Sequence, residues 1–472
     1  MVVMKFGGTS VEDAAALRRV INIIRSRLDA RPVVVVSALA GVTDQLLEAG
    51  KTAAGGHLGA ALDTVRKIYI RHEQLAGELV EGLAHRALEG ELRGEFRSLE
   101  ALLHELAASR KLDLESLDHL LGFGECLSSK LVTAALAETN ISAAHVDARA
   151  CIVTDARYGQ ARPLWDATNQ RILDALCSLV ESSNVPVLGG FVAATADGVP
   201  TTLGRGGSDF TAAILGAALD AARIEIWTDV DGVMTADPKL CPEARVIRKM
   251  NFDEAAELAR CGAKVLHPST LAPAMRADIP VLVLNSRRPE GEGTEITARA
   301  HTADAVSAIT AKRNVIAVQL DPQQGVDSEL LRAVYAVLEN YGCLFDLTAA
   351  SPNRLSLLVS ATEAFAEIVA DLQGVAEGIR VRWENHKALV RVVGKKIHLK
   401  TGAASRAFAA ISDLDAHFVS QGAFDRSISF LVEESKVEQS VQRLHELFFP
   451  PREASRDWGG ISAAYCESGH PG

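Results

Sequence analysis

A lysine and two glycines stand at the end of the first apolar run, where they could bind an anion. Lys5, Gly7 and Gly8 follow the strand-like Val2–Phe6 and precede a helix-forming stretch over 14–25. Backbone N–H groups at a helix start carry partial positive charge, and a lysine beside them adds a full charge. The lysine precedes the glycines, so the segment is no Walker A loop, and taken alone an ordinary tight turn is the simpler interpretation.

A glycine loop with an arginine and a carboxylate begins a second predicted helix. Residues 201–209 read T-T-L-G-R-G-G-S-D and lead into an apolar helical run. The guanidinium of Arg205 can hold a carboxylate through two parallel hydrogen bonds, and the N–H groups of the loop can bind the same oxygens. Ser208 or Asp209 could instead be a plain N-cap, and the spacing favours anion binding only modestly over that alternative.

Two further segments place polar residues beside predicted elements. Thr228 and Asp229 end a strand-like run, and Met234 and Lys239 follow in the same polar stretch. Ligands of open α/β sheets bind beyond the carboxyl ends of the strands, although such a stretch is more often an ordinary loop. Glu125, preceded by G-F-G, stands ahead of another predicted helix, and an acid is favoured in a first turn without any further role.

Short apolar runs and helical stretches alternate over residues 1–297, which is typical of a parallel sheet covered by helices. The expected strands are 2–6, 32–37, 144–147, 185–189, 225–227 and 281–284. The stretch 52–120 differs, because leucines at helical spacing, such as Leu75, Leu79 and Leu83, occur without a strand signal. We therefore expect an α/β domain, a mainly parallel sheet sandwiched by helices, with an all-helical insertion.

An internal repeat follows a linker at 287–293 that is rich in charge, Pro and Gly. The order strand, helix, strand, strand, helix occurs twice, which predicts two ferredoxin-like units over 312–383 and 384–450. The last segment, 451–472, is rich in Gly, Ser and Pro, and we expect a flexible tail.

Composition narrows the class of protein. The chain has 472 residues, 49 Lys+Arg against 60 Asp+Glu, a formal charge of −11 and 48% hydrophobic residues. The acidic balance gives no attraction to nucleic acid or to anionic lipid, and the apolar runs are too short to span a bilayer. Seven scattered cysteines without a C-x-x-C pair indicate a reducing compartment, so we expect a cytoplasmic protein with neither nucleic-acid nor membrane partners.

Taken together, these segments resemble aspartate kinase, a member of the amino-acid-kinase superfamily. The resemblance rests on K-F-G-G-T-S at 5–10, S-A-L-A-G-V-T at 37–43, G-E at 124–125, the 201–209 loop, W-T-D-V-D-G at 227–232 and G-A-K-V-L-H-P at 262–268. It extends over residues 1 to about 450, because the repeat resembles the paired ACT domains of the same family and the helical insertion also matches.

The resemblance implies ATP and Mg²⁺ as cofactors, with no metal held by protein ligands. Lys5 would neutralise charge on the transferred phosphoryl group, and Asp209 would orient Lys5. Phosphoryl transfer depends on positioning and charge neutralisation, so the site requires no nucleophilic side chain. The residues implied at the nucleotide are Lys5, Phe6, Gly7, Gly8, Thr228, Asp229, Met234, Lys239, Lys264 and Val265.

The resemblance also implies L-aspartate as the substrate. Arg205 would hold its α-carboxylate and Glu125 its α-ammonium, while the β-carboxylate attacks the γ-phosphoryl group to give 4-phospho-L-aspartate. This is the first step of the aspartate-derived amino acid pathway, which supplies lysine and threonine. The remaining residues implied at the substrate are Thr43, Gly206, Gly207 and Ser208.

The chain departs from the family pattern in the ACT units. Lysine-inhibited relatives have a Gly ahead of the first ACT helix, where this chain has D-S-E at 327–329, and S-E-V-S where it has S-P-N-R at 351–354. Pro352 lacks the N–H that an amino-acid effector would need, and Glu329 would repel an effector carboxylate. We expect weak or atypical feedback inhibition. A smaller departure is Met234, where relatives often carry Tyr beside the base.

We expect the ACT units to join a homodimer, because edges of such sheets are commonly covered by a second copy, and dimers could pair further into a tetramer. Two alternatives to an aspartate kinase stay open. One is another amino-acid kinase, against which the Arg205 loop and the ACT pair argue. The other is a catalytically weak paralogue that senses amino acids or binds a partner, against which the retention of Lys5, Glu125, Arg205 and Asp209 argues.

Overall fold

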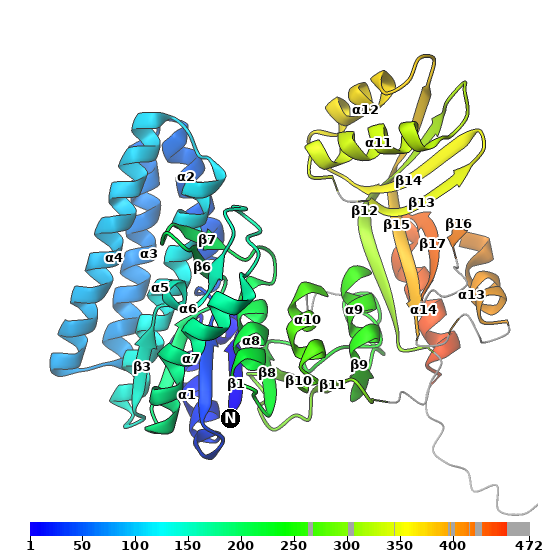
Figure 1. Cartoon of the computed structure of the whole chain (residues 1–472). Helices are drawn as coiled ribbons and strands as arrows, with labels where there is room; N and C mark the ends of the chain where they lie inside the picture. The colour runs from blue at the N-terminus through cyan, green and yellow to red at the C-terminus, as the bar shows by residue number, and fades with distance from the viewer. Residues whose placement is uncertain are drawn as a thin grey trace, which may run out of the picture.

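The computed structural model describes residues 1–262, 268–300, 306–343, 345–394, 397, 402–414, 416–420 and 427–450. The expected flexible tail, 451–472, lies outside these residues, as do Lys264 and Val265. Figure 1 shows an N-terminal α/β region and, on its far side from the long helices α2–α4, a C-terminal region built around a second sheet.

An eight-stranded sheet forms the centre of the N-terminal region. Neighbouring strands are parallel from β3 to β10, β11 runs antiparallel to β10, and β9 is parallel to β11. In spatial order the strands are β3 (Ala143–Val146), β5 (Val185–Gly189), β2 (Pro32–Val36), β1 (Val2–Phe6), β8 (Arg223–Thr228), β10 (Val281–Asn285), β11 (Thr294–Thr297) and β9 (Lys249–Asn251). All six strands expected from the apolar runs are confirmed.

Helices cover both faces of this sheet, because successive side chains of a strand point to opposite faces. Val2, Met4 and Phe6 of β1 pack against one helical layer, and Val3 packs into the core on the other face. The first layer contains α1 (Ala14–Arg25) and the long helices described below. The second contains α6 (Ala148–Cys151), α7 (Trp165–Glu181), α8 (Gly207–Ala218), α9 (Phe252–Arg260) and α10 (Pro268–Arg276).

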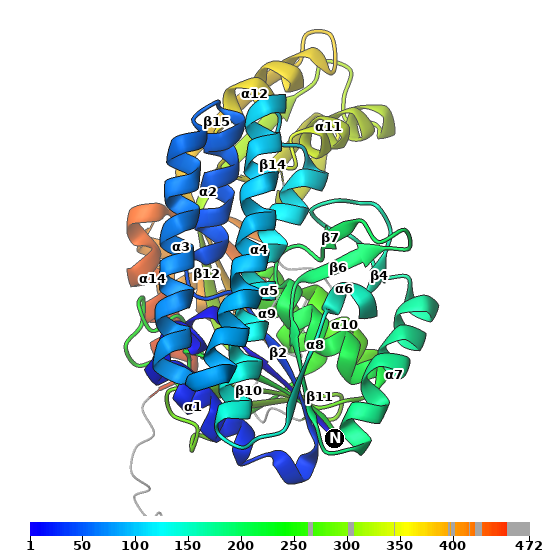
Figure 2. The same ribbon diagram turned by 90° about the vertical axis from the view of Figure 1, so that its left-hand side faces the viewer.

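The stretch 52–120, expected as an all-helical insertion, contains helices and no strand (Figure 2). Its helices are α2 (Val42–Ala54), α3 (Leu58–Leu79), α4 (Gly82–Ser109) and α5 (Leu114–Glu138). Leu83 is 80% exposed, although it was expected in the same apolar stripe as Leu75. The two residues belong to different helices, because α3 ends at Leu79 and α4 begins at Gly82. The expectation of a helix start after Glu125 is also wrong, because α5 runs unbroken through this residue.

Helix α5 is long and apolar enough by composition to cross a membrane, but 67% of its most apolar window is buried inside the protein. It lies in the core between the sheet and the other long helices, where an apolar surface all round is expected. A small sheet contains β4 (Val153–Thr154), β6 (Val192–Thr195) and β7 (Pro200–Thr202), and its last two strands lead the chain from β5 to α8.

The C-terminal region contains one antiparallel sheet of six strands in the order β13-β14-β12-β15-β17-β16. The predicted strand, helix, strand, strand, helix order is confirmed in both copies. The first copy contains β12 (Ala308–Asp321), α11 (Ser328–Asn340), β13 (Phe345–Ser351), β14 (Arg354–Ser360) and α12 (Phe365–Gly374). The second contains β15 (Arg380–Val393), α13 (Ala403–Ile411), β16 (His417–Ser420), β17 (Ser427–Glu433) and α14 (Val437–Phe448).

The two copies share their central strands. The first half of β12 pairs with 389–393 and packs in the core of α13 and α14, whereas its second half pairs with 380–384 and packs in the core of α11 and α12. The expected boundary between residues 383 and 384 therefore falls inside β15, and the division of this region into two units stays a prediction.

Candidate functional site

Lys5 and Asp209 form an ion pair between β1 and α8. The side chain of Lys5 lies on the same face of β1 as Val3, the face covered by α8, and Asp209 lies in the first turn of that helix. The Lys5 Nζ to Asp209 Oδ1 distance is 2.7 Å, and both side chains are nearly buried. The carboxylate thus holds the lysine ammonium in place between β1 and α8.

The start of α8 has no side-chain cap in the part of the chain that the structure describes. Its N-cap is Gly206, in the left-handed region at φ 73°, a conformation that favours glycine. The plain N-cap interpretation of Ser208 or Asp209 is therefore wrong. The positive end of α8 and the exposed Arg205 beside it are arranged to receive an anion.

Close packing of β5 against α8 explains a glycine that the sequence analysis did not use. A Cβ atom on Gly190 would lie 2.5 Å from the Cβ of Ser208, so no larger residue fits between the end of β5 and the first turn of α8. The absence of a side chain here lets α8 begin directly over the end of the sheet.

Glu125 lies in the middle of α5 and is 4% exposed. Its Oε2 atom has no hydrogen-bond partner among the residues that the structure describes. Burial raises the pKa of Glu125 to about 8, although a hydrogen bond from the backbone of Ala38 and the charge of Lys5 oppose the shift. A buried carboxyl group with an unsatisfied oxygen is stabilised when a cation binds beside it.

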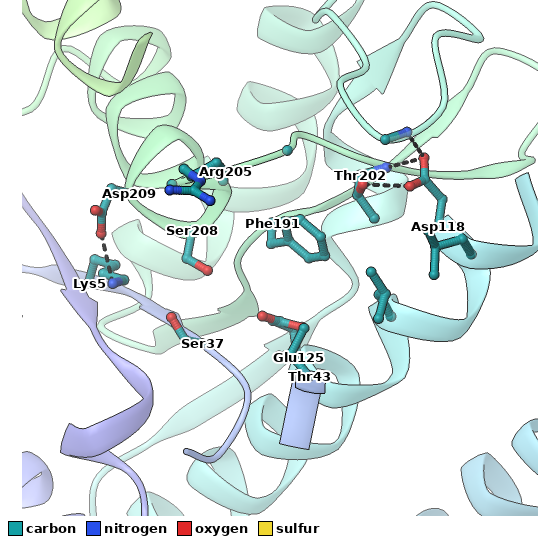
Figure 3. A pocket seen from close by; sticks show the side chains of 16 residues that line it. Lys5, Ser37, Thr43, Asp118, Glu125, Phe191, Thr202, Arg205, Ser208 and Asp209 are labelled. Carbon is teal, nitrogen blue, oxygen red and sulfur yellow. Dashed lines mark hydrogen bonds and ion pairs between the residues drawn. The ribbon is translucent and has the colours of Figure 1, made fainter. Parts of the chain in front are cut away.

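These groups meet in one cavity of about 470 Å³ (Figure 3). All residues expected at the substrate line it, namely Thr43, Glu125, Arg205, Gly206, Gly207 and Ser208, together with Lys5 and Asp209. The cavity places a potential cation site at Glu125 and an anion site at Arg205 within one enclosure. Its dimensions suit a small zwitterion.

The sequence analysis did not assign the other lining residues to the site, and the polar or aromatic ones among them are Ser37, Asp118, Phe191 and Thr202. Phe191 adopts φ 66°, which is unusual for a bulky residue and typical of functional sites. A signal was present for Asp118, because it stands seven residues before Glu125 in an otherwise apolar helical segment, on the same helix face.

Of the described residues expected at the nucleotide, Lys5 alone lines this cavity. Strands β1 and β8 are parallel neighbours, so Phe6 is paired with Trp227, and the N–H of Gly7 donates to the Trp227 carbonyl at 3.0 Å. This register brings Gly7 and Gly8 next to Thr228 at the carboxyl ends of both strands.

Met234 and Lys239 lie farther along, in the loop of residues 229–248 between β8 and β9, here called the β8–β9 loop. Met234 is half-buried in a bridge to Val246, and Lys239 is exposed. The structure brings neither residue to the cavity of Figure 3.

The C-terminal region holds the β8–β9 loop in place. Thr235 Oγ1 lies 2.9 Å from Nε2 of His445 in α14, and the N–H of Ile309 donates to the Thr235 carbonyl at 2.7 Å. Ala236 and Cys241 of the loop belong to the apolar core of α13 and α14. Burial and the charge of Arg245 lower the pKa of His445, which keeps the ring neutral at physiological pH.

No group of three or more His, Cys, Asp or Glu side chains that could hold a metal occurs in the described residues. The donor set of the site is cationic and N–H-rich, which suits phosphate oxygens. A divalent ion that arrives bound to nucleotide phosphates fits such a site, since Mg²⁺ commonly keeps most of its waters and takes few protein ligands.

Comparisons with known proteins agree with this geometry. Residues 1–285 match the amino acid kinase family, and residues 390–448 match an ACT domain. The chain is 34% identical to chloroplastic aspartokinase 2 of Arabidopsis thaliana, over 95% of this chain and 84% of that protein. It is 33% identical to lysine-sensitive aspartokinase 3 of Escherichia coli K12, over 95% and 99% of the two chains.

Among solved structures, E. coli aspartokinase III in complex with aspartate and ADP is similar, with a TM-score of 0.84 and 31% identity over 95% of this chain and 100% of that one. The same enzyme in complex with lysine and aspartate has a TM-score of 0.80. The family match and the nearly full-length relatives establish that the chain belongs to the amino acid kinase family and, within it, to the aspartokinases.

Proposed function

We propose that the chain transfers the γ-phosphoryl group of ATP to the β-carboxylate of L-aspartate, giving 4-phospho-L-aspartate. The observation that carries the proposal is the pairing, in one cavity, of the unsatisfied carboxyl oxygen of Glu125 with the anion site at Arg205 and α8. An α-amino acid offers the complementary ammonium and carboxylate. The similar E. coli enzyme, whose complex contains aspartate and ADP, supports the same substrates here.

Each side chain has a separate part in this reaction. Arg205, with the N–H groups of Gly206 and Gly207, holds the α-carboxylate, and Glu125 accepts the α-ammonium. Thr43 and Ser208 offer hydroxyl groups to the same substrate. The β-carboxylate is then directed towards Lys5, whose charge is already oriented by Asp209 at 2.7 Å.

ATP would lie over Gly7 and Gly8 beside Lys5, with Thr228 and Asp229 at the neighbouring strand end. Met234 and Lys239 of the β8–β9 loop complete the nucleotide side. Mg²⁺ bound to the phosphates would supply charge neutralisation during the transfer. The ammonium of Lys5 neutralises charge at the transferred group, so the protein needs no covalent intermediate.

A hydroxamate assay for acyl phosphate tests the proposal. With ATP and Mg²⁺, aspartate should give hydroxamate and succinate should not, because succinate lacks the ammonium that Glu125 requires. Arg205→Ala is the matched control, because hydroxamate that still forms with this variant does not depend on the proposed binding site. Turnover of succinate at the rate of aspartate, or no product from aspartate, would contradict the proposal and would favour the alternative of a catalytically weak amino-acid sensor.

We further propose that lysine inhibits this enzyme weakly, because the loops of the first ACT unit satisfy their own polar groups. Asp327 is the N-cap of α11 and accepts from the N–H groups of Glu329 and Leu330 at 3.0 and 2.8 Å. The positive end of this helix is thus already used by a carboxylate.

The facing hairpin is also internally paired. Arg354 donates to Asp321 at 2.9 Å, and this hydrogen bond holds the pKa of that carboxyl below its usual range. The N–H of Val326 donates to the carbonyl of Pro352 at 2.8 Å. An effector carboxylate would have to break these bonds, so the free energy of effector binding is reduced by their loss.

Titration with lysine, threonine and both together, at saturating ATP and aspartate near its KM, tests this regulation. We expect half-inhibition only above about 1 mM, which corresponds to an effector binding free energy weaker than roughly −4 kcal/mol. The variant Asp327→Gly, which frees the start of α11, should strengthen inhibition. Tight inhibition of the parent enzyme would overturn the proposal.

We also propose a cytoplasmic homodimer joined through the C-terminal sheet, with pairing into a tetramer as an extension. Strand β13 is an edge of this sheet and is largely exposed, with Phe345 at 48%. Sedimentation of the full chain should give a dimer or a larger even assembly, and Ala349→Glu on β13 should dissociate it. The same change at the exposed Ala87 of α4 is the control.

A further inference from the structure

We propose that Asp118 is a positioning residue for aspartate binding: its buried carboxylate holds the Arg205 loop, residues 203–206, in its binding conformation. This inference rests on the proposed role of Arg205 as the α-carboxylate clamp. Asp118 lies in α5, is 1% exposed and lines the cavity of Figure 3.

The carboxylate of Asp118 joins two segments that are distant in sequence. Oδ2 accepts hydrogen bonds from the N–H groups of Gly159 and Thr202, both at 2.9 Å, and Oδ1 accepts from the Thr202 hydroxyl at 2.6 Å. Figure 3 shows these bonds at the end of the cavity away from Lys5. Three protein donors therefore engage the two carboxylate oxygens, so most of the acceptor capacity of Asp118 is used in holding these segments.

The two tethered segments pack directly against the Arg205 loop. Thr202 is the last residue of β7 and immediately precedes the loop. A Cβ atom on Gly204, which has φ 74°, would lie 3.0 Å from the carbonyl oxygen of Gly159. The N–H of Ala161 also donates to the Thr202 carbonyl at 2.9 Å. Asp118 thus fixes the strand end that carries the loop and the turn that supports it.

The position of Asp118 on α5 gives this tether a geometric role. Glu125 stands seven residues later on the same helix, two turns away on the same face. One rigid helix therefore carries both the acceptor of the ammonium and the support of the carboxylate clamp. We infer that α5 sets the separation between the two binding groups and so favours an α-amino acid over acids with a different spacing.

The cost of burying the Asp118 carboxylate indicates that its hydrogen bonds have a specific role in the structure. A buried carboxylate is costly, and burial raises the pKa of Asp118, while the donors from Thr202 and Gly159 act against this shift. A neutral apolar side chain would avoid the cost but would leave two backbone N–H groups and a hydroxyl without an acceptor.

The variant Asp118→Asn separates geometry from charge, because asparagine is nearly isosteric with aspartate. The amide oxygen can accept both N–H groups, and the amide nitrogen can donate to the Thr202 hydroxyl, which can accept as well as donate. Asp118→Ala and Thr202→Val remove the tether, whereas Thr202→Ser retains the hydroxyl.

Steady-state kinetics of the full-length enzyme provide the test. We expect Asp118→Ala to raise the KM for aspartate at least about tenfold and to leave the KM for ATP within about twofold, as expected when buried hydrogen bonds to one binding loop are lost. Asp118→Asn and Thr202→Ser should keep the KM for each substrate within about threefold of the parent value. Thr202→Val should raise the aspartate KM by less than Asp118→Ala does but by more than these two conservative variants do.

A matched control separates positioning from stability. Thr168 is fully buried, ties α7 to β4 through two hydrogen bonds with Val153 and does not line the cavity. Thr168→Val should lower the Tm without a change in either KM. The proposal is overturned if Asp118→Ala leaves the aspartate KM unchanged, if both KM values rise together, or if Asp118→Asn is as impaired as Asp118→Ala.

Thr202→Val carries the same test if Asp118→Ala does not fold. Failure of the proposed reaction itself would appear differently, as an absence of hydroxamate formation in the parent enzyme.

Discussion

The cavity that we assign to aspartate and the loop that we assign to the nucleotide are supported by different parts of the molecule. The aspartate cavity is lined by residues 5–209, and its ion pair and tether lie within the same range. The β8–β9 loop, which we place at the nucleotide, depends on His445 and on the core of α13 and α14. On the proposed assignment, substrate recognition is therefore local to the N-terminal region, whereas the loop at the nucleotide is supported by the C-terminal region.

This difference shows how one enzyme can keep its substrate specificity while its activity remains open to control. A shift of α14 would reach the β8–β9 loop through the Thr235–His445 contact and would leave the Glu125 site untouched. Variants in the two regions should therefore change different kinetic constants.

The largest effect is expected at Lys5, which lies between the two sides. Lys5→Ala should lower kcat by about 10²–10⁴, with smaller changes in both KM values, because the ammonium stabilises charge that develops in the transition state. Initial rates at saturating substrates measure this, with the exposed Lys249→Ala as control. A folded Lys5→Ala enzyme with near-normal kcat would remove Lys5 from the mechanism.

Arg205→Lys tests whether aspartate binding can be weakened without a change in ATP binding. We expect the aspartate KM to rise at least about tenfold, because an ammonium cannot reproduce the two parallel hydrogen bonds of a guanidinium. The KM for ATP should stay constant. An equal rise in both constants would show that the two sides are not separate.

The pH dependence of aspartate binding sharpens the same distinction. Glu125 must be ionised to accept an ammonium, and its raised pKa of about 8 leaves it protonated below that pH. Binding is therefore favoured above pH 8 and lost as the pH falls, and the aspartate KM should rise roughly tenfold from pH 9 to pH 7. Glu125→Gln should abolish the dependence. A flat profile in the parent enzyme would contradict the assignment.

The smallest effect is expected from the contact between the regions. Loss of the hydrogen bond between Thr235 and His445 costs about 1 kcal/mol, so His445→Phe should raise the KM for ATP roughly fivefold. The aspartate KM should not change. Gln439→Ala, on the exposed face of the same helix, is the control. If His445→Phe altered only the aspartate KM, the C-terminal region would support the aspartate site and not the nucleotide loop.

Much of the fold follows from local sequence patterns. The central strands, such as Val2–Phe6 and Pro32–Val36, are continuous β-branched and apolar runs, because both faces of a parallel sheet are buried. The Arg205 loop could be predicted as an anion site because glycines, a cation and a helix start are contiguous in sequence. Motifs of this kind need no tertiary information.

The remainder depends on contacts between distant segments. Short strands such as β4 and β9, of two and three residues, carry too little periodicity to be recognised. Asp118 acquires its role only from donors 41 and 84 residues away. The shared strands β12 and β15 are likewise set by pairing across the sheet, which no local pattern encodes.

During synthesis, Thr235 leaves the ribosome 210 residues before His445. At bacterial or eukaryotic translation rates this interval is roughly 10–40 s. The nascent chain in this interval already contains every residue that lines the aspartate cavity, but Ala236 and Cys241 still lack the core that buries them. A chain released early would therefore carry a substrate pocket without a supported nucleotide loop. Synthesis of α14 therefore completes the support of the loop that we place at the nucleotide.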